Sequence, residues 1–235
     1  MQLTVREASK FLDVSESTVT RWIKQRGLPA QHVGGQYRFN RAEVLEWAAA
    51  NQIKVSLELF DHFETDDEPV PTLAEALQAG GIFYGLKGTG KESALRSLVE
   101  VLPLPAGTDR ELLFRLFLAR EASAPTAIGG GIALPHTRNP VILHVDRPMV
   151  TLCFLEQPVE FGAMDGKPVQ AFFSLVCPTM RSHLQMLSRI SFALHDPPFK
   201  EAVMRQSSPE EILREACRVE ESLPAPSPAA GKASD

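Results

Sequence analysis

The sequence predicts two domains, a small and mainly helical one followed by an α/β domain with a mixed sheet flanked by helices. Capped helical patterns and a glycine-centred hairpin pattern fill the first 55 residues, whereas apolar strands alternate with helices from residue 72 onward. An acidic stretch separates the two parts. With 235 residues, 44% of them hydrophobic, the chain has room for two small cores.

Charge is divided unevenly between the two parts. Residues 1–55 hold eight basic and five acidic residues, a net charge of +3, which leaves −8 on the remaining 180 residues of a chain with a total of −5. Such asymmetry indicates separate functions. Residues 56–71 contain six acidic residues and no lysine or arginine, and we expect an acidic linker there. Residues 222–235 are rich in proline and in small side chains, so we expect a disordered tail there.

Two short helices are predicted at the start of the first domain. Thr4 and Glu7 have the spacing of a capping box, which predicts a helix through Leu12. Ser15 opens a second helix whose apolar residues repeat at intervals of three and four, and Gly27 ends it. Two short helices joined by two or three residues are typical of a helix-turn-helix.

A hairpin and a third helix follow. Gly34-Gly35 lies between two short strand patterns, and glycine accepts the positive φ values that a tight turn requires. Asn40 then caps a helix that contains Val44 and Leu45. The order helix, turn, helix, hairpin, helix predicts a small winged helix-turn-helix domain.

Residues 4–47 resemble the excisionase and MerR-like DNA-binding families. The resemblance implies that residues 1–55 bind DNA, with the second helix in the major groove and the hairpin near the backbone or minor groove. The expected DNA contacts are Ser17, Thr18, Arg21, Lys24, Gln36 and Arg38. The alternative is that Arg21 and Arg38 are solvated surface charges. A net charge of +3 predicts weak nonspecific affinity, which a homodimer on a palindromic site would strengthen.

The second domain begins with another capping box, Thr72 and Glu75, before a helix that ends at Gly80 and a short strand. The following glycines and Lys91 imitate a phosphate-binding loop, but Glu92 stands where that loop needs a hydroxyl, so we reject nucleotide binding. Helices are expected over residues 110–122, 183–194 and 209–221, and strands over residues 149–155 and 169–176.

Residues 120–136 contain the groups that could take part in a reaction. Thr126 and the three glycines Gly129, Gly130 and Gly131 are expected to form a phosphate loop with open backbone amides. His136 follows a proline, and a neutral imidazole there can act as a nucleophile, although a structural histidine is the alternative. Ser182 and Gln185 have capping-box spacing, which predicts His183 in the first turn of a helix, where an anion is favoured.

This stretch resembles the type-2 enzyme IIA domain of the phosphoenolpyruvate-dependent sugar phosphotransferase system, in its fructose/mannitol and nitrogen-regulatory branches. The family pattern, an acidic or amide residue and then an aliphatic-Ala-aliphatic-Pro-His run, fits Glu121 and residues 128–136; Thr137 departs from the Gly, Ala or Cys that usually follows. The resemblance covers roughly residues 73–221, about three-fifths of the chain, in the domain expected over residues 72–221. It implies that His136 accepts a phosphoryl group from the phosphocarrier protein HPr, while His183 and Arg120 line the site.

No cofactor or metal is expected. Cys153, Cys177 and Cys217 are odd in number and far apart, which favours free thiols. Glu121 with Asp165 could suggest acid/base catalysis, but a local hydrogen-bonding role for Glu121 is preferred. No metal-ligand spacing occurs among the remaining histidines, which are His32, His62, His144 and His195.

The preferred function is a phosphorylation-responsive regulator, a phosphocarrier through a transient phosphohistidine that is linked to DNA binding. Coupling through dimerisation, through a partner or by masking of the basic helix stays open. One alternative is an enzyme IIA component that passes phosphate to a IIB protein or sugar permease, and another is a partner-binding domain that is never phosphorylated. The start of the chain has no secretory pattern and no apolar run spans a membrane, so we expect a cytoplasmic protein.

Overall fold

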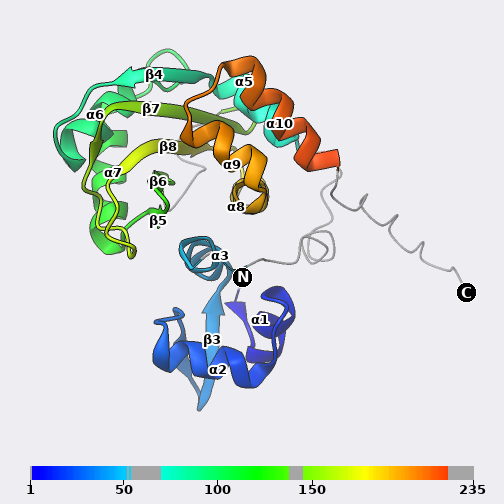
Figure 1. The fold of residues 1–235 in the computed structure, drawn as a ribbon. Helices are drawn as coiled ribbons and strands as arrows, with labels where there is room; N and C mark the ends of the chain where they lie inside the picture. Colours follow the sequence, from blue (N-terminus) through cyan, green and yellow to red (C-terminus); the bar gives the residue numbers. More distant parts are fainter. Residues whose placement is uncertain (1, 52, 54–69, 138–144, 222–235) are drawn as a thin grey trace, which may run out of the picture.

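A computed structural model describes residues 2–51, 53, 70–137 and 145–221. The predicted order is confirmed, with a small helical region first and then an α/β domain (Figure 1). Most of the predicted acidic linker and all of the predicted tail lie outside the described residues, as do His62 and His144. Within the described residues, no helix has both the length and the apolar character that crossing a membrane requires.

The N-terminal domain follows the predicted series of elements and adds one strand. Its strands form an antiparallel sheet in the order β1-β3-β2, of which the two-residue β1 was not predicted. Gly34 and Gly35 turn the hairpin with φ values of 58° and 79°. The elements are β1 (Gln2–Leu3), α1 (Val5–Phe11), α2 (Glu16–Gln25), β2 (Gln31–Val33), β3 (Gln36–Asn40) and α3 (Arg41–Ala50).

Side-chain caps fix where the first two helices begin. The Thr4 hydroxyl accepts from the Glu7 amide while the Glu7 carboxylate accepts from the Thr4 amide, which confirms the predicted capping box. The Ser15 hydroxyl accepts from the amide of Thr18 at the start of α2. The inner faces of these helices bury Phe11 and Val19 in the core of the domain.

The α/β domain has a mixed five-stranded sheet in the order β4-β7-β8-β6-β5. The β4–β7 and β6–β8 pairs are parallel, whereas β7–β8 and β5–β6 are antiparallel. The β5–β6 hairpin and α9 were not predicted. The elements are α5 (Leu73–Gly80), β4 (Ile82–Leu86), α6 (Lys91–Val101), α7 (Arg110–Ser123), β5 (Ala127–Gly129), β6 (Ile132–Ala133), β7 (Met149–Val159), β8 (Val169–Val176), α8 (Met180–His195), α9 (Pro197–Met204) and α10 (Pro209–Glu221).

Helices cover both faces of this sheet. Alternate residues of β7 point to opposite sides, so Leu152 and Phe154 join the core under α5, α8, α9 and α10, while Cys153 and Leu155 join the core under α6 and α7. The near-continuous burial of β7 and β8 follows from this double cover.

The two ends of the α/β domain are joined by one carboxylate. Glu220 near the end of α10 accepts from the backbone amide of Leu73 at 2.7 Å, in the first turn of α5. It also pairs with Arg189 of α8 at 2.5 Å. Glu220 thus satisfies an amide that the start of α5 would otherwise leave unpaired, and it holds α5 beside α10 (Figure 1).

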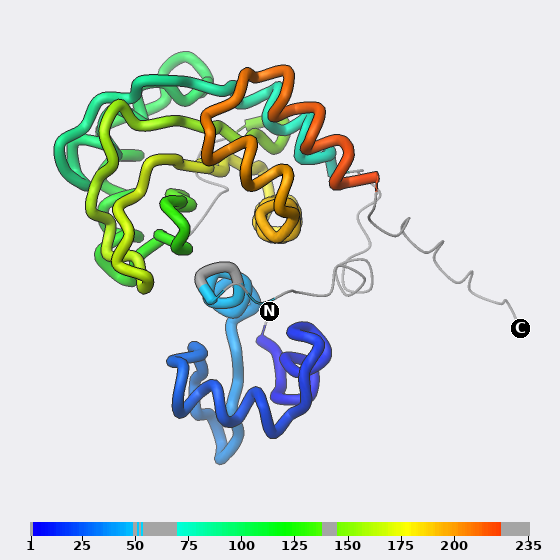
Figure 2. Tube along the Cα trace, viewed as in Figure 1, coloured from blue at the N-terminus to red at the C-terminus, as the bar shows by residue number. Residues whose placement is uncertain are grey.

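The two domains meet along α3. This helix packs against α8 and β5 of the α/β domain (Figures 1 and 2). Leu184 of α8 is only 7% exposed because it belongs to the apolar cluster of the N-terminal domain, together with Trp47 of α3. The helix α2 lies on the opposite side of that domain, away from the sheet.

Candidate functional site

His136 lies just after β6, at a bridge to Leu175 of β8 that fixes the backbone beside the sheet. Its side chain is 2% exposed. The Nδ1 atom lies 2.6 Å from the carbonyl oxygen of Leu134. Because a carbonyl only accepts, Nδ1 carries a proton and donates it, and Nε2 is left as the nitrogen at which chemistry can occur.

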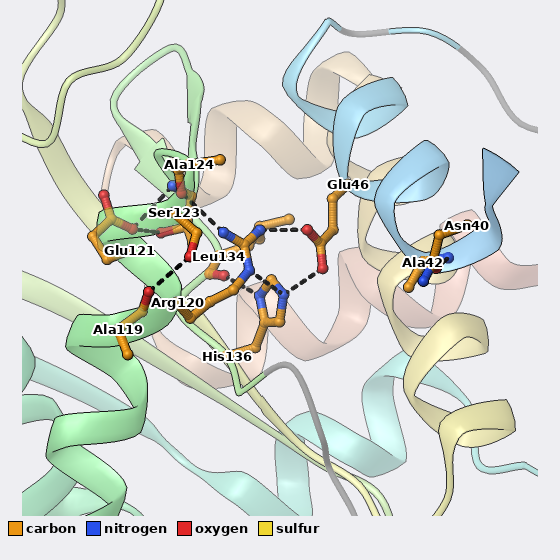
Figure 3. A network of polar contacts seen from close by, with 11 residues as sticks. Asn40, Ala42, Glu46, Ala119, Arg120, Glu121, Ser123, Ala124, Leu134 and His136 are labelled. Atoms are coloured by element: carbon orange, nitrogen blue, oxygen red, sulfur yellow. Dashed lines mark hydrogen bonds and ion pairs between the residues drawn. The ribbon is translucent and has the colours of Figure 1, made fainter. Parts of the chain in front are cut away.

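Arg120, at the C-terminal end of α7, faces this nitrogen (Figure 3). Its Nε lies 3.3 Å from Nε2 of His136, and its Nη1 donates to the carbonyl of Ala124 at 2.9 Å. The second bond holds the guanidinium in place. A fixed cation beside a buried imidazole suits a site that receives an anion.

His183 is the third sequence-predicted member of the site. Its ring centroid lies 5.2 Å from that of His136, so the two histidines are neighbours. Burial lowers the pKa of His183 to about 3, aided by the nearby His136 and Arg120 and opposed by Glu46, so the ring is neutral at physiological pH. Its Nδ1 is buried without a hydrogen-bond partner among the described residues.

The cap of α8 differs from the prediction. Thr179 is the N-cap and forms the capping box with Ser182, so the predicted pairing of Ser182 with Gln185 was wrong. His183 is still in the first turn, but its amide already donates to the carbonyl of Thr179 at 3.1 Å. That amide therefore contributes no open donor to an anion.

The fourth member, Glu46, comes from the other domain. Its Oε1 lies 2.8 Å from Nε2 of His136, and its Oε2 pairs with Nη2 of Arg120 (Figure 3). Burial alone would raise the pKa of Glu46, but the hydrogen bond and charge of His136 and the charge of Arg120 outweigh it and lower the pKa to about 2. Glu46 is therefore ionised at neutral pH.

Three of these groups also offer ligand atoms for a metal ion. Glu46, His136 and His183 place one ligand atom each within 4.8 Å of one another, a donor set that zinc accepts. However, the Arg120 guanidinium bonds to two of these three residues and would repel a divalent cation. The arrangement fits an anion better than a metal.

The predicted phosphate loop needs correction. Gly129, Gly130 and Gly131 turn the β5–β6 hairpin with φ values of 83°, 62° and 80°. The amide of Gly130 is not open, because it donates to Asp165 at 2.7 Å. These glycines serve the turn of the hairpin.

Thr126 lies beside the site, but its polar groups are already paired. Its amide and hydroxyl both donate to Glu121, at 3.0 and 2.5 Å, and the other oxygen of Glu121 pairs with Lys91 at 2.9 Å. Glu121 therefore has the local hydrogen-bonding role preferred from the sequence. Lys91 is a structural cation at the start of α6, in keeping with the rejection of nucleotide binding.

The predicted DNA contacts form a separate group, far from this site. Ser17, Arg21 and Lys24 are exposed on α2, and Gln36 is exposed on β3, while Thr18 and Arg38 are half-buried. The Thr18 hydroxyl is 2.9 Å from that of Ser15, within the helix cap. Since α2 faces away from the α/β domain, that domain does not mask the basic helix in this arrangement (Figure 1).

The sequence and its family resemblance point to His136, His183 and Arg120 as one site but give no sign of Glu46. Glu46 is one of two acidic residues on α3, with Glu43, and nothing in its local pattern distinguishes it. Its position depends on how two domains pack, and only an unexplained charge on the inner side of α3 could have suggested a partner.

Comparisons with known proteins match each of the two domains. The family model described as "Phosphoenolpyruvate-dependent sugar phosphotransferase system, EIIA 2" matches residues 75–215, and a helix-turn-helix family model matches residues 3–52. A nitrogen regulatory protein of Bradyrhizobium diazoefficiens is 32% identical over 49% of this chain and 74% of its own. A fructose-specific EIIA component of Haloferax volcanii is 31% identical over 52% and 79%.

A solved structure supports the same assignment. The nitrogen regulatory protein IIA-Ntr from Neisseria meningitidis superposes with a TM-score of 0.51 and 26% identity, covering 63% of this chain and 95% of its own. The family model lies in the α/β part of the chain. The chain therefore belongs to the EIIA type 2 family of the phosphoenolpyruvate-dependent sugar phosphotransferase system and carries a helix-turn-helix domain at its N-terminus.

Proposed function

We propose that the chain is a phosphoacceptor of the EIIA type whose phosphorylation state controls a DNA-binding domain. The observation that carries the first half is the orientation of His136. Its Nδ1 donates to the Leu134 carbonyl, and its Nε2 therefore faces the fixed guanidinium of Arg120. The donor would be a phosphorylated carrier protein such as HPr.

The phosphoryl transfer needs only the donor and His136 as reactants. The lone pair of Nε2 on His136 attacks the phosphorus of the donor's phosphohistidine, the donor's P–N bond breaks, and its electron pair returns to the donor ring. Arg120 offsets charge on the transferred group. Neutral His183, held beside His136, can donate one ring N–H to a phosphoryl oxygen without adding a competing positive charge.

The second half of the proposal is supported by the exposed α2 helix. Arg21 and Lys24 lie on a solvent-facing side of a helix-turn-helix domain, where base edges and phosphates can be reached. Regulation is preferred over sugar transport because this DNA-binding type of domain is joined directly to the phosphoacceptor. The likeness to proteins named nitrogen regulatory protein agrees with that preference.

The phosphoacceptor is tested by incubating the full chain with phosphoenolpyruvate, enzyme I and HPr. We expect acid-labile label on the wild type and none on His136→Ala. His32→Ala is the matched control, because His32 is exposed on β2 and should label like the wild type. Label on His136→Ala equal to that of the wild type would contradict the assignment.

The link to DNA is tested with the upstream region of the chain's own operon. The phosphorylated and unphosphorylated full chain should differ in affinity for this DNA, and His136→Ala should be insensitive to the donor mixture. Equal affinity of both wild-type forms would remove the regulatory half of the proposal while leaving the phosphoacceptor intact.

A further inference from the structure

The N-terminal domain reaches into the phosphoacceptor site with one charged side chain. Glu46 of α3 is 19% exposed, and its two oxygens are divided between Nε2 of His136 and the guanidinium of Arg120. These are the nucleophile and the cation that a phosphoryl group would need. The carboxylate thus stands where the oxygens of a transferred phosphoryl group would be.

Contact with Glu46 also obstructs the nucleophilic nitrogen. The Glu46 carboxylate lies 2.8 Å from Nε2 of His136, and Nε of Arg120 lies 3.3 Å from the same nitrogen. Nδ1 of the same ring donates to Leu134. Both ring nitrogens are therefore engaged in this arrangement, and the carboxylate stands where phosphorus would have to approach Nε2.

Space in the site leads to the same conclusion. The void between Glu46, Arg120, Thr126 and His136 measures about 20 Å³, which holds about one water molecule. With His136 only 2% exposed, a donor protein cannot bring its phosphorus in line with Nε2. Glu46 must leave before transfer.

Charge then keeps the two groups apart after transfer. A phosphorylated side chain carries a charge of about −1.5 to −2 at neutral pH. Glu46 would face it as an ionised carboxylate in a partly buried site, and Arg120 would have to serve two anions. Two negative charges placed side by side in this partly buried site would repel strongly, because water screens them poorly.

We propose that Glu46 is a built-in occupant of the phosphoryl position, so that docking of the N-terminal domain and phosphorylation of His136 exclude one another. This inference rests on the proposed phosphoacceptor function. Phosphorylation would release α3 from α8 and β5. Since α2 is already exposed in the docked form, release changes how the DNA-binding domain is held and does not uncover its basic helix.

The first test measures the initial rate of labelling at limiting phosphorylated HPr. Loss of a charge-assisted hydrogen bond predicts that Glu46→Ala accepts phosphate roughly 10-fold to 100-fold faster than the wild type. Glu46→Gln keeps the size and removes the charge, so it should also be faster, by a smaller factor. Glu43→Gln is the control on the same helix and should match the wild type.

The second test measures docking itself by small-angle scattering of the full chain. The radius of gyration should increase when the wild type is phosphorylated, and Glu46→Ala should show the increase without phosphate. The inference would be overturned if the wild type and both Glu46 variants were labelled at equal rates and the radius of gyration did not increase on phosphorylation. The proposed function would then still stand. Absence of label from every folded variant would instead overturn the proposed function.

Discussion

The two helices α2 and α3 of the N-terminal domain are of equal length but meet opposite environments. On α2, Arg21 and Lys24 extend into solvent. On α3, Trp47 is 8% exposed and Glu46 is bound to two residues of the α/β domain. Because the helices lie on opposite sides of the domain, DNA and the α/β domain would not compete for one surface (Figure 1).

This difference teaches that a small domain can carry two interfaces on separate surfaces, connected through the apolar core that its helices share. The α2 side offers positive charge to a polyanion. The α3 side offers one negative charge to a site built for an anion. Each of the following variants should change the properties of one side only. A variant that changed both sides would contradict this comparison.

The largest effect is expected on the α3 side from Arg120→Ala. This change leaves Glu46 and His136 without their buried cation, and breaking a buried charge pair costs about 3–5 kcal/mol. Urea unfolding should show the loss. Arg115→Ala, on the exposed side of the same helix, should change the free energy of unfolding by about 0.5 kcal/mol or less. Equal losses for the two variants would show that the Arg120 contacts do not stabilise the chain.

Removing the apolar part of the same interface should have the next largest effect. Leu184 packs in the N-terminal core although it belongs to α8, so Leu184→Ala should weaken docking by about 2 kcal/mol or more. Hydrogen exchange of the α3 amides should then be faster. Met180→Ala, at the exposed start of α8, provides the control and should leave that exchange as in the wild type.

A change on the α2 side should affect DNA alone. Arg21→Ala should weaken binding to the chain's own upstream DNA by about 1–3 kcal/mol, measured by fluorescence anisotropy at fixed salt. Lys10→Ala on α1 is the control, since it removes a positive charge outside the predicted contacts. Labelling of His136 should be the same in all three proteins. A slower labelling rate in Arg21→Ala would mean that the two sides are not separate.

The last prediction concerns pH, which should change the free energy of unfolding gradually rather than in one step. His183 has a pKa of about 3 in the folded chain against 6.5 for the free side chain, so between these values the unfolded chain binds more protons and stability falls as the pH is lowered. One proton corresponds to a slope of about 1.4 kcal/mol per pH unit. His183→Gln should show a shallower slope between pH 6.5 and 4.5 in urea unfolding. The Glu46 contribution is fully present above the free value of 4.5 and is lost as the pH falls from there through its folded pKa of about 2, so it lies below this window.

Much of the fold could be predicted because its boundaries are set locally. The capping boxes at Thr4 and Thr72 and the Gly34-Gly35 turn need only neighbouring residues, and all three occur as predicted. The strand β1 was missed because two residues become a strand only by pairing with β3. The α9 helix was missed because Asp196 both ends α8 and caps α9, so that no loop separates the two.

The residues of the site also divide into those that the sequence indicates and those that only tertiary packing places. The family resemblance pointed to His136, His183 and Arg120, so these three could be found from the sequence. The correction at Gly130 arises from Asp165, thirty-five positions along the chain, which takes the amide that the sequence left open. Glu46 lies ninety positions before His136, in another domain, and only tertiary packing brings them together.

The contacts of Glu220 with Leu73 and Arg189 have a consequence for how such a chain can evolve. By tying the first turn of α5 to the end of α10, it makes both ends of the α/β domain leave from one corner. A neighbouring domain can then be gained by gene fusion at that corner without any rebuilding of the sheet. For the control proposed above, a domain fused there would need an apolar contact such as the one Leu184 makes, together with an acidic side chain that faces His136.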